Sequence, residues 1–176
     1  MLSDSKPVRV FRYCPRCGSK NFVETSGRSK KCDDCGFHYF FNTSAAAAGL
    51  IFNKEGKLLF TRRAIEPHRG MLDLPGGFIE PMETAEDAIA REIKEELGVG
   101  VKKLSYYCSF PNEYPFSGFS VFTLDLIYKV ELETLVGLKA MDDISRFEFY
   151  SLDEINLAEI PSYSIQKVVE KLIQDE

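Results

Sequence analysis

The sequence predicts a layered α+β fold, preceded by a small cysteine-rich unit. Three observations lead to this prediction. Residues 1–42 hold four paired cysteines and few aliphatic side chains, so this segment needs a stabilising cross-link in place of a hydrophobic core. From Ala45 onward, short apolar segments separated by turns have the length of β-strands. Few segments show helical spacing of apolar residues, and we therefore assign residues 43–176 to one α+β or α/β/α layered domain.

Apolar segments bounded by turn residues predict the strands. They cover residues 45–53, 57–64, 72–81, 101–110, 117–130 and 146–150. A Lys-Glu-Gly turn at 54–56 joins the first two, and Pro75, Gly76 and Gly77 interrupt the third. Two closing helices are expected over residues 151–155 and 164–174.

One further helix is expected to begin after Thr84. This residue type is a good N-cap, and Asp87, three residues on, gives a variant of the capping box. Gly98 fits the position that ends a helix. The buried stripe at helical spacing consists of Ala85, Ala88, Ile89, Ile93 and Leu97.

Charge and hydropathy exclude several classes of protein. The net charge of −5 and the pI of about 5.2 argue against general nucleic-acid binding through a basic surface. A phosphorylated substrate remains compatible, because bound divalent cations invert the local charge of an acidic site. The longest apolar run, Ala45–Phe52, is much shorter than the roughly 20 residues of a membrane helix. The N-terminus lacks a signal peptide, so we expect a cytoplasmic protein.

The paired cysteines predict a structural zinc site. Two CxxC pairs are separated by fourteen residues, which is the spacing of a four-cysteine zinc site, and the ligands are Cys14, Cys17, Cys32 and Cys35. The alternative is redox chemistry by one CxxC pair. Four thiolates leave no open position on the ion, which argues against catalysis there. His38 is expected at the surface or in packing, and Cys108 as a core thiol.

The predicted helix after Thr84 carries a carboxylate cluster. Glu92, Glu95 and Glu96 fall on one helix face. Three carboxylates crowded there repel one another, which cations relieve, and hard oxygen ligands suit Mg²⁺ or Mn²⁺. The alternative for this string alone is a solvated acidic helix face.

The residues around the cluster extend the pattern. From Gly77 the chain reads GFIEPMETAEDAIAREIKEELGV, which closely resembles the Nudix box, G-x5-E-x7-R-E-U-x-E-E-x-G-U with U apolar, at every specified position. The resemblance implies that Glu92 and Glu96 are metal ligands, and that Glu95 is a further ligand or orients the attacking water. It also implies that Arg91 holds Glu83 and its loop, and that the carbonyl of Gly76 coordinates a metal.

The sequence leaves several carboxylates as candidates for the general base. In some members of the family a glutamate on a late loop has this role, but Arg146 stands at the corresponding place here. The alternatives are Asp142, Asp143, Glu148 and Glu95.

A four-cysteine unit directly before a Nudix box resembles the NADH pyrophosphatase family, over residues 13–155. The resemblance implies a Nudix-type α/β/α sandwich with a mixed sheet over residues 43–176, a zinc ribbon over residues 1–42 and a possible homodimer. Members carry S-Q-P-W-P-F-P-x-S after the box, whereas this chain has SFPNEYPFS at 109–117. Four positions match, and Asn112 takes the tryptophan position.

The candidate substrate-binding residues are Arg62, Phe110, Asn112, Tyr114 and Phe116. The aromatic rings are suited to stack on a nicotinamide, flavin or adenine, and Arg62 or Arg63 to meet phosphate. The alternatives are an aromatic loop that packs on the sheet and a solvated arginine pair.

The sequence thus leads to one principal hypothesis and two others. The principal hypothesis is metal-dependent hydrolysis of the phosphoanhydride in a dinucleotide (NADH, NAD or FAD) or ADP-ribose, which releases a mononucleotide. The second is removal of an NAD-type cap from RNA. The third is a non-catalytic Nudix-derived sensor that binds a nucleotide and regulates a partner. In the first hypothesis the partner is a small-molecule nucleotide, and in the second it is a capped RNA. Both hypotheses require Mg²⁺ or Mn²⁺ for catalysis and Zn²⁺ for structure.

Overall fold

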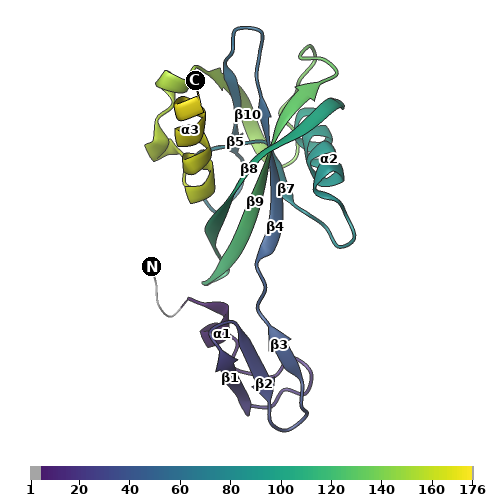
Figure 1. Cartoon of the computed structure of the whole chain (residues 1–176), viewed down its shortest axis with the longest axis vertical. Helices are drawn as coiled ribbons and strands as arrows, with labels where there is room; N and C mark the ends of the chain where they lie inside the picture. Colours follow the sequence, from purple (N-terminus) through teal and green to yellow (C-terminus); the bar gives the residue numbers. More distant parts are fainter. Residues whose placement is uncertain (1–4, 176) are drawn as a thin grey trace. The chain divides into compact units, whose positions relative to one another are not determined.

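A computed structural model describes residues 5–175 of the chain (Figure 1). The chain divides into two compact units. The first comprises residues up to Thr43 together with Glu113–Phe122, and the second comprises Ser44–Asn112 with Thr123 and the residues that follow. None of the helices within residues 5–175 is long and apolar enough to cross a membrane.

The first unit is a small three-stranded sheet. Helix α1 (Pro7–Val10) precedes strands β1 (Phe22–Ser26), β2 (Ser29–Cys32) and β3 (His38–Phe40), which pair antiparallel in the order β1-β2-β3. Its core consists of little more than Cys14, Phe22 and Cys32, with Cys35 and Phe37 packed against them. Such a small core leaves no clear apolar alternation in the sequence, which is why these strands were not predicted.

The second unit holds two sheets that together form its central layer. The bounds of the strands are β4 (Ser44–Ile51), β5 (Leu58–Arg63), β6 (Leu72–Asp73), β7 (Gly76–Phe78), β8 (Val101–Phe116), β9 (Phe119–Leu132) and β10 (Ile144–Tyr150). The parts of β8 and β9 within Glu113–Phe122 belong to the first unit. One sheet has the order β10-β5-β6 and the other β7-β4-β9-β8. Strand β4 pairs parallel with β9 and antiparallel with β7, so the larger sheet is mixed.

Helices α2 (Ala85–Leu97) and α3 (Tyr163–Asp175) lie on opposite sides of these strands (Figure 1). Strand β5 alternates between two cores: Leu59 packs in a cluster with Ile93 of α2, whereas Phe60 packs in a cluster with Val168 of α3. Cys108 is partly buried against the α3-side cluster. The predicted α+β fold, with a layer of helix on each side of the strands, is confirmed.

Helix α2, which carries the carboxylate cluster, begins and ends where its capping residues predict. Thr84 is the N-cap and accepts a hydrogen bond from the Asp87 N–H at 3.1 Å, and Gly98 is the C-cap. The helix predicted over residues 164–174 is confirmed as α3, but the other closing helix differs. Residues 151–155 form only a 3-10 turn, η1 (Leu152–Glu154), and a second turn, η2 (Leu157–Glu159), follows it. These pieces are too short to give a helical period in the sequence.

The segment predicted as an aromatic loop is instead a strand. Strand β8 continues to Phe116 and turns through Ser117 and Gly118 into β9. Both turn residues have positive φ, 49° and 80°, as a two-residue hairpin of type I′ requires. Pro111 and Pro115 suggested a break in the sequence, but β8 is the edge strand of its sheet, where proline is tolerated.

Candidate active site and zinc site

Two glycines allow the backbone of β7 to lie close to strand β4 and to helix α2. A β-carbon on Gly76 would collide with the carbonyl of Ala47 in β4, and one on Gly77 would collide with the carboxylate of Glu92. The Gly76 N–H donates to Oε2 of Glu96 at 3.0 Å. The Pro-Gly-Gly interruption therefore brings backbone polar groups to the carboxylate face of the helix.

Arg91 organises the loop between β7 and α2. Its guanidinium donates to both oxygens of Glu83, from Nε at 2.9 Å and from Nη2 at 3.0 Å, and Nη2 also donates to the carbonyl of Phe78 at 3.1 Å. Nη1 donates to Glu92 at 2.8 Å and to Glu95 at 3.0 Å. One cation thus joins the loop carboxylate to two of the three clustered glutamates, as a planar fork of donors permits.

Glu96 is the most deeply buried of the three glutamates, with 4 % of its surface exposed. Burial raises its pKa to about 9, and the negative charge of Asp143 adds to this shift. Glu92 and Asp73 contribute in the same direction, while the Gly76 N–H opposes it. The pKa of Glu92 is also raised, first by desolvation. Ionised carboxylates crowded at this depth need positive charge beside them.

This donor set fits a divalent cation. Carboxylate oxygens of Glu92 and Glu96 and the nearby backbone of Gly76 are hard ligands, which Mg²⁺ and Mn²⁺ prefer. Within residues 5–175, however, only the cysteine group brings three or more ligand atoms of His, Cys, Asp or Glu within 4.8 Å of one another. The three glutamates therefore do not form a closed cage, and Glu95, exposed at its side chain by 49 %, lies at the rim on Arg91.

The candidate bases differ in their surroundings. Asp143 is close enough for its charge to raise the pKa values of Glu92 and Glu96. Glu148 instead pairs with Arg62 at 2.9 Å and with Arg146 at 3.4 Å, and these contacts hold its pKa low. Asp142 lies in the loop before β10 with a φ of 52°. Of the three late carboxylates, Asp143 is the one whose field reaches the clustered glutamates.

Arg62 is engaged by several partners of its own. Besides Glu148, it donates to the Gly70 carbonyl at 3.0 Å and the Tyr150 hydroxyl at 3.1 Å, and it pairs with Glu159 at 2.8 Å. Arg63 donates to the carbonyl of Pro67 and to Asp73. A phosphate contact by Arg62 requires the exchange of one of these partners.

The sequence did not single out Asp73 and Asp125, and the charge of Asp73 acts on the clustered glutamates. Asp73 of β6 contributes to the field on Glu96, and desolvation raises its own pKa to about 6 against the opposing charge of Arg63. Asp125 of β9 adds to that shift and accepts hydrogen bonds from Thr123, at 2.6 Å, and Ser164. Each aspartate stands between two leucines in a strand, and an acid inside an apolar strand is the signal that would have identified both.

The predicted substrate-binding residues of β8 do not share one environment. Phe110 packs against the α3-side cluster, and Asn112 has a buried side-chain oxygen for which the described residues provide no hydrogen-bond partner. Both belong to the second unit, whereas Tyr114 and Phe116 belong to the first. The rings of Tyr114 and Phe116 are nearly parallel, with an interplanar angle of 17° and centroids 6.2 Å apart. Phe116 is 53 % exposed.

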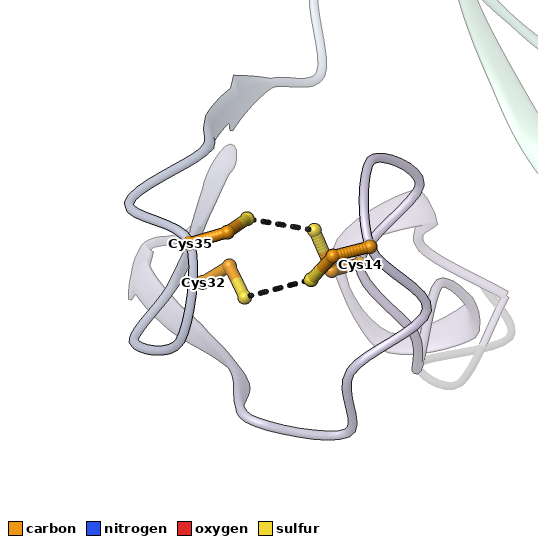
Figure 2. A group of neighbouring side chains, drawn as sticks. Cys14, Cys32 and Cys35 are labelled. Atoms are coloured by element: carbon orange, nitrogen blue, oxygen red, sulfur yellow. Dashed lines mark hydrogen bonds between the residues drawn. The ribbon is translucent and has the colours of Figure 1, made fainter.

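The four cysteines of the first unit converge on one point (Figure 2). The Sγ atoms of Cys14 and Cys35 are 3.7 Å apart, and those of Cys17 and Cys32 are 3.6 Å apart. A tetrahedral zinc with Zn–S distances of about 2.3 Å has sulfur atoms about 3.8 Å apart, so the group fits this ion. Desolvation opposes ionisation of Cys14, but hydrogen bonds from the backbone of Cys17 and Arg16 lower its pKa to about 7. These amides favour a thiolate ligand.

A separate shallow groove of about 320 Å³ lies between the ends of β4, β8 and β9. Leu50, Lys103, Lys129 and Glu131 are among the residues that line it. None of the candidate catalytic or substrate-binding residues does. The groove therefore adds nothing to the assignment of the site.

Residues 42–171 match the family described as NUDIX domain. NAD-capped RNA hydrolase NudC of Vibrio parahaemolyticus is 36 % identical over 119 residues, which cover 67 % of this chain and 45 % of that protein. ADP-ribose pyrophosphatase of Methanocaldococcus jannaschii is 37 % identical over 130 residues, 72 % of each chain. The crystal structure of a NUDIX hydrolase from Nitrosomonas europaea shares the fold, with a TM-score of 0.65 and 21 % identity over 91 % of both chains. The matched region spans less than half of the Vibrio protein.

Proposed function

This chain belongs to the Nudix family, and we propose that it hydrolyses the phosphoanhydride of a nucleoside diphosphate linked to a second moiety. The substrate class is a dinucleotide (NADH, NAD or FAD) or ADP-ribose, and one product is a mononucleotide. The observation that carries this proposal is the arrangement around Arg91, which joins Glu83, Glu92 and Glu95 while Glu96 lies buried against the Gly76 N–H. The name of the Methanocaldococcus relative supports the substrate class.

In this proposal Glu92 and Glu96, with Glu95 and the Gly76 carbonyl, hold Mg²⁺ or Mn²⁺. Bound there, the cations lower the pKa of a water molecule and neutralise phosphate charge. Arg91 keeps Glu83 and its loop against the helix, so that the ligands are positioned before substrate arrives. We propose Asp143 as the general base that accepts the proton of the attacking water, because its charge raises the pKa values of both Glu92 and Glu96. Glu148 is held by Arg62 and Arg146.

Residues 1–42 form a zinc ribbon in this proposal, with Zn²⁺ bound by the four cysteines, and residues 43–176 form the hydrolase domain. A closed set of four thiolates gives the zinc a structural role. Phe110, Asn112, Tyr114 and Phe116 contribute to substrate selection. The side-chain oxygen of Asn112 is buried without a hydrogen-bond partner among residues 5–175, and an amide or amino group of a substrate that reaches it would supply one.

A second candidate function is the removal of an NAD-type cap from RNA. The specific observation in its favour is the Vibrio relative, whose name is NAD-capped RNA hydrolase. The bond that is cut is the same P–O–P bridge, so the same carboxylate face serves both candidates. They differ in what must be bound beyond the dinucleotide.

The test is a substrate panel with Mg²⁺, in which NADH, NAD, FAD, ADP-ribose and NAD-capped RNA are incubated in oxygen-18 water. We expect a mononucleotide product with one labelled phosphate, identified by mass. Glu96→Gln is the inactive control. Retention of nucleotide binding without any hydrolysis across the panel would instead identify the chain as a nucleotide sensor and overturn the proposal.

A further inference from the structure

One face of the small sheet in the first unit is exposed and carries both rings and cations. The register places Val23, Lys31 and His38 side by side across β1, β2 and β3. Phe40 lies on the same face of β3 as His38, because alternate residues of a strand share a face. We call this set the ribbon face, and its members are Val23, Thr25, Arg28, Lys31, His38 and Phe40, all of them exposed.

The side chains of the ribbon face contact one another. The rings of His38 and Phe40 are 4.4 Å apart between centroids. The guanidinium carbon of Arg28 lies 6.0 Å from the centroid of the Phe40 ring, and Thr25 Oγ1 lies 3.2 Å from Nε2 of His38. Phe40 nevertheless remains 44 % exposed. The result is an aromatic platform with a cation at its edge, open to a ligand.

The opposite face of the same sheet is occupied. Phe22 and Cys32 are buried in the small core, and Tyr39 packs between Phe37 and Phe41. Phe41 in turn contacts Phe11 at 5.3 Å. These contacts account for the rings on that side by packing. They do not account for His38 and Phe40, which contribute little to the core. Exposure of these rings to water costs free energy, and a bound ligand would remove that cost.

The charge of this region is opposite to that of the rest of the chain. Residues 1–43 hold eight Lys and Arg against four Asp and Glu, whereas residues 44–176 hold fourteen against twenty-three. The overall value of −5 is therefore an average over a basic segment and a strongly acidic one. The segment stays positive even when four thiolates and one Zn²⁺ are included, because that centre contributes only two negative charges.

We propose that the ribbon face binds single-stranded RNA, with bases stacked on Phe40 and His38 and phosphates paired with Arg28 and Lys31. A flat aromatic surface edged by cations suits single strands, whose bases are free to stack, and not duplexes, whose bases are already paired. The inference rests on the second candidate function in one respect: the strand it binds is the body of a capped RNA. Because the ribbon face and the clustered glutamates belong to one chain, binding the strand raises the local concentration of its 5′ end at the hydrolase domain.

The first experiment measures binding by fluorescence anisotropy of a labelled 12-nucleotide oligouridine with the full chain. Phe40→Ala should weaken binding about fivefold or more, as expected for the loss of one stacked base. Tyr39→Ala is the matched control, since Tyr39 is an aromatic of equal exposure, 43 %, on the opposite face of the same strand. Zinc content verifies that each variant retains its ribbon. Equal affinities of the two variants, or duplex RNA bound as tightly as the single strand, would overturn the proposal.

The salt dependence of binding tests the two cations. Removing both with Arg28→Ala/Lys31→Ala should reduce the slope of log K against log salt by about 1.4, since each phosphate contact on a single strand contributes about 0.7. Lys54→Ala/Lys103→Ala removes the same charge from exposed positions of the second unit and should leave the slope unchanged. If both double variants lower the slope equally, the attraction is nonspecific and the ribbon face is not the site.

The third experiment separates this inference from the proposed function. Phe40→Ala should raise KM about fivefold or more for NAD-capped oligouridine and leave kcat/KM for free NAD unchanged. A wild-type chain that binds the oligonucleotide but hydrolyses neither these two compounds nor NADH, FAD or ADP-ribose would overturn the proposed function and leave the binding site standing. Hydrolysis of both compounds with no effect of Phe40→Ala on either would overturn the inference alone.

Discussion

The cysteine cluster of the first unit and the glutamate cluster of helix α2 differ in how closely their possible ligand atoms are gathered. The four Sγ atoms already lie within 4.8 Å of one another, at separations that match a bound zinc. The glutamate oxygens are not gathered in this way, and Glu92 and Glu95 are paired with Arg91. A complete ligand shell serves to hold a fold together, whereas an incomplete shell leaves positions for water and phosphate oxygens.

The comparison also concerns what each cluster does for stability. The first unit has only a small hydrophobic core, so a zinc ion bound by the cysteines is expected to supply much of its folding free energy. The glutamates stand on a helix whose opposite face packs Ile89, Ile93 and Leu97 into the α2-side cluster. That helix has its own stability, and the raised pKa values of Glu92 and Glu96 show that the carboxylates are held there at a cost.

The largest expected effect is the loss of the ribbon structure when its metal is removed. We predict one tightly bound zinc per chain, measured by elemental analysis of protein purified without added metal. Cys32→Ser should abolish amide protection in β1, β2 and β3, because zinc contributes about 10–16 kcal/mol in zinc-finger peptides. Protection in α2 should be unaffected. Less than about 0.2 zinc per chain with the ribbon still protected would show that the cluster is not a metal site.

The next effect concerns catalysis without folding. Glu96→Gln keeps the size of the side chain and an acceptor for the Gly76 N–H but removes the charge, so the melting temperature should be retained. The value of kcat should fall a few hundred-fold to a thousand-fold, or roughly 3–4 kcal/mol of transition-state stabilisation. Glu131→Gln, an exposed glutamate paired with Lys102, is the control and should not alter kcat. Near-native kcat of Glu96→Gln at saturating Mg²⁺ contradicts the assigned role.

A smaller effect is expected from the spacing between β7 and α2. Gly77→Ala places a methyl group against the carboxylate of Glu92, which must then move. A displacement of about 1 Å costs on the order of a hundredfold in rate, so kcat/KM should fall by up to that factor. Gly27→Ala is the matched control, because a β-carbon there meets no atom within 4 Å. Unchanged kinetics in both variants would mean that the position of Glu92 is not critical.

The smallest effect concerns substrate selection. Tyr114→Ala and Phe116→Ala should raise KM for the best dinucleotide more than for a small pyrophosphate substrate, with roughly 1–3 kcal/mol for each lost stacking contact. The comparison of the two substrates within one variant serves as the control. Equal, small changes for both substrates would assign these two rings to packing in the first unit.

Several features followed directly from the sequence because they depend on local physics. The helix Ala85–Leu97 begins and ends where Thr84 and Gly98 predict, since capping involves only neighbouring residues. The strand character of residues 111–116 was missed for the opposite reason. Prolines at 111 and 115 and the run of aromatics indicate a loop locally, but pairing with β9 across a tight turn at Ser117 and Gly118 extends the strand.

By itself, the sequence determined the cysteine spacing, the complete Nudix pattern and the helix face that carries its glutamates, because spacing and helical period are properties of the chain. Only the tertiary structure decided which residues from distant parts of the sequence act on these glutamates. Asp73 and Asp143 come from two different segments, and folding brings their charges close enough to raise the pKa of Glu96. Arg62 donates hydrogen bonds to Glu148 and Tyr150 because strand β10 pairs with strand β5. Contacts of this kind depend on strand order and register, and a single sequence does not encode either in a local pattern.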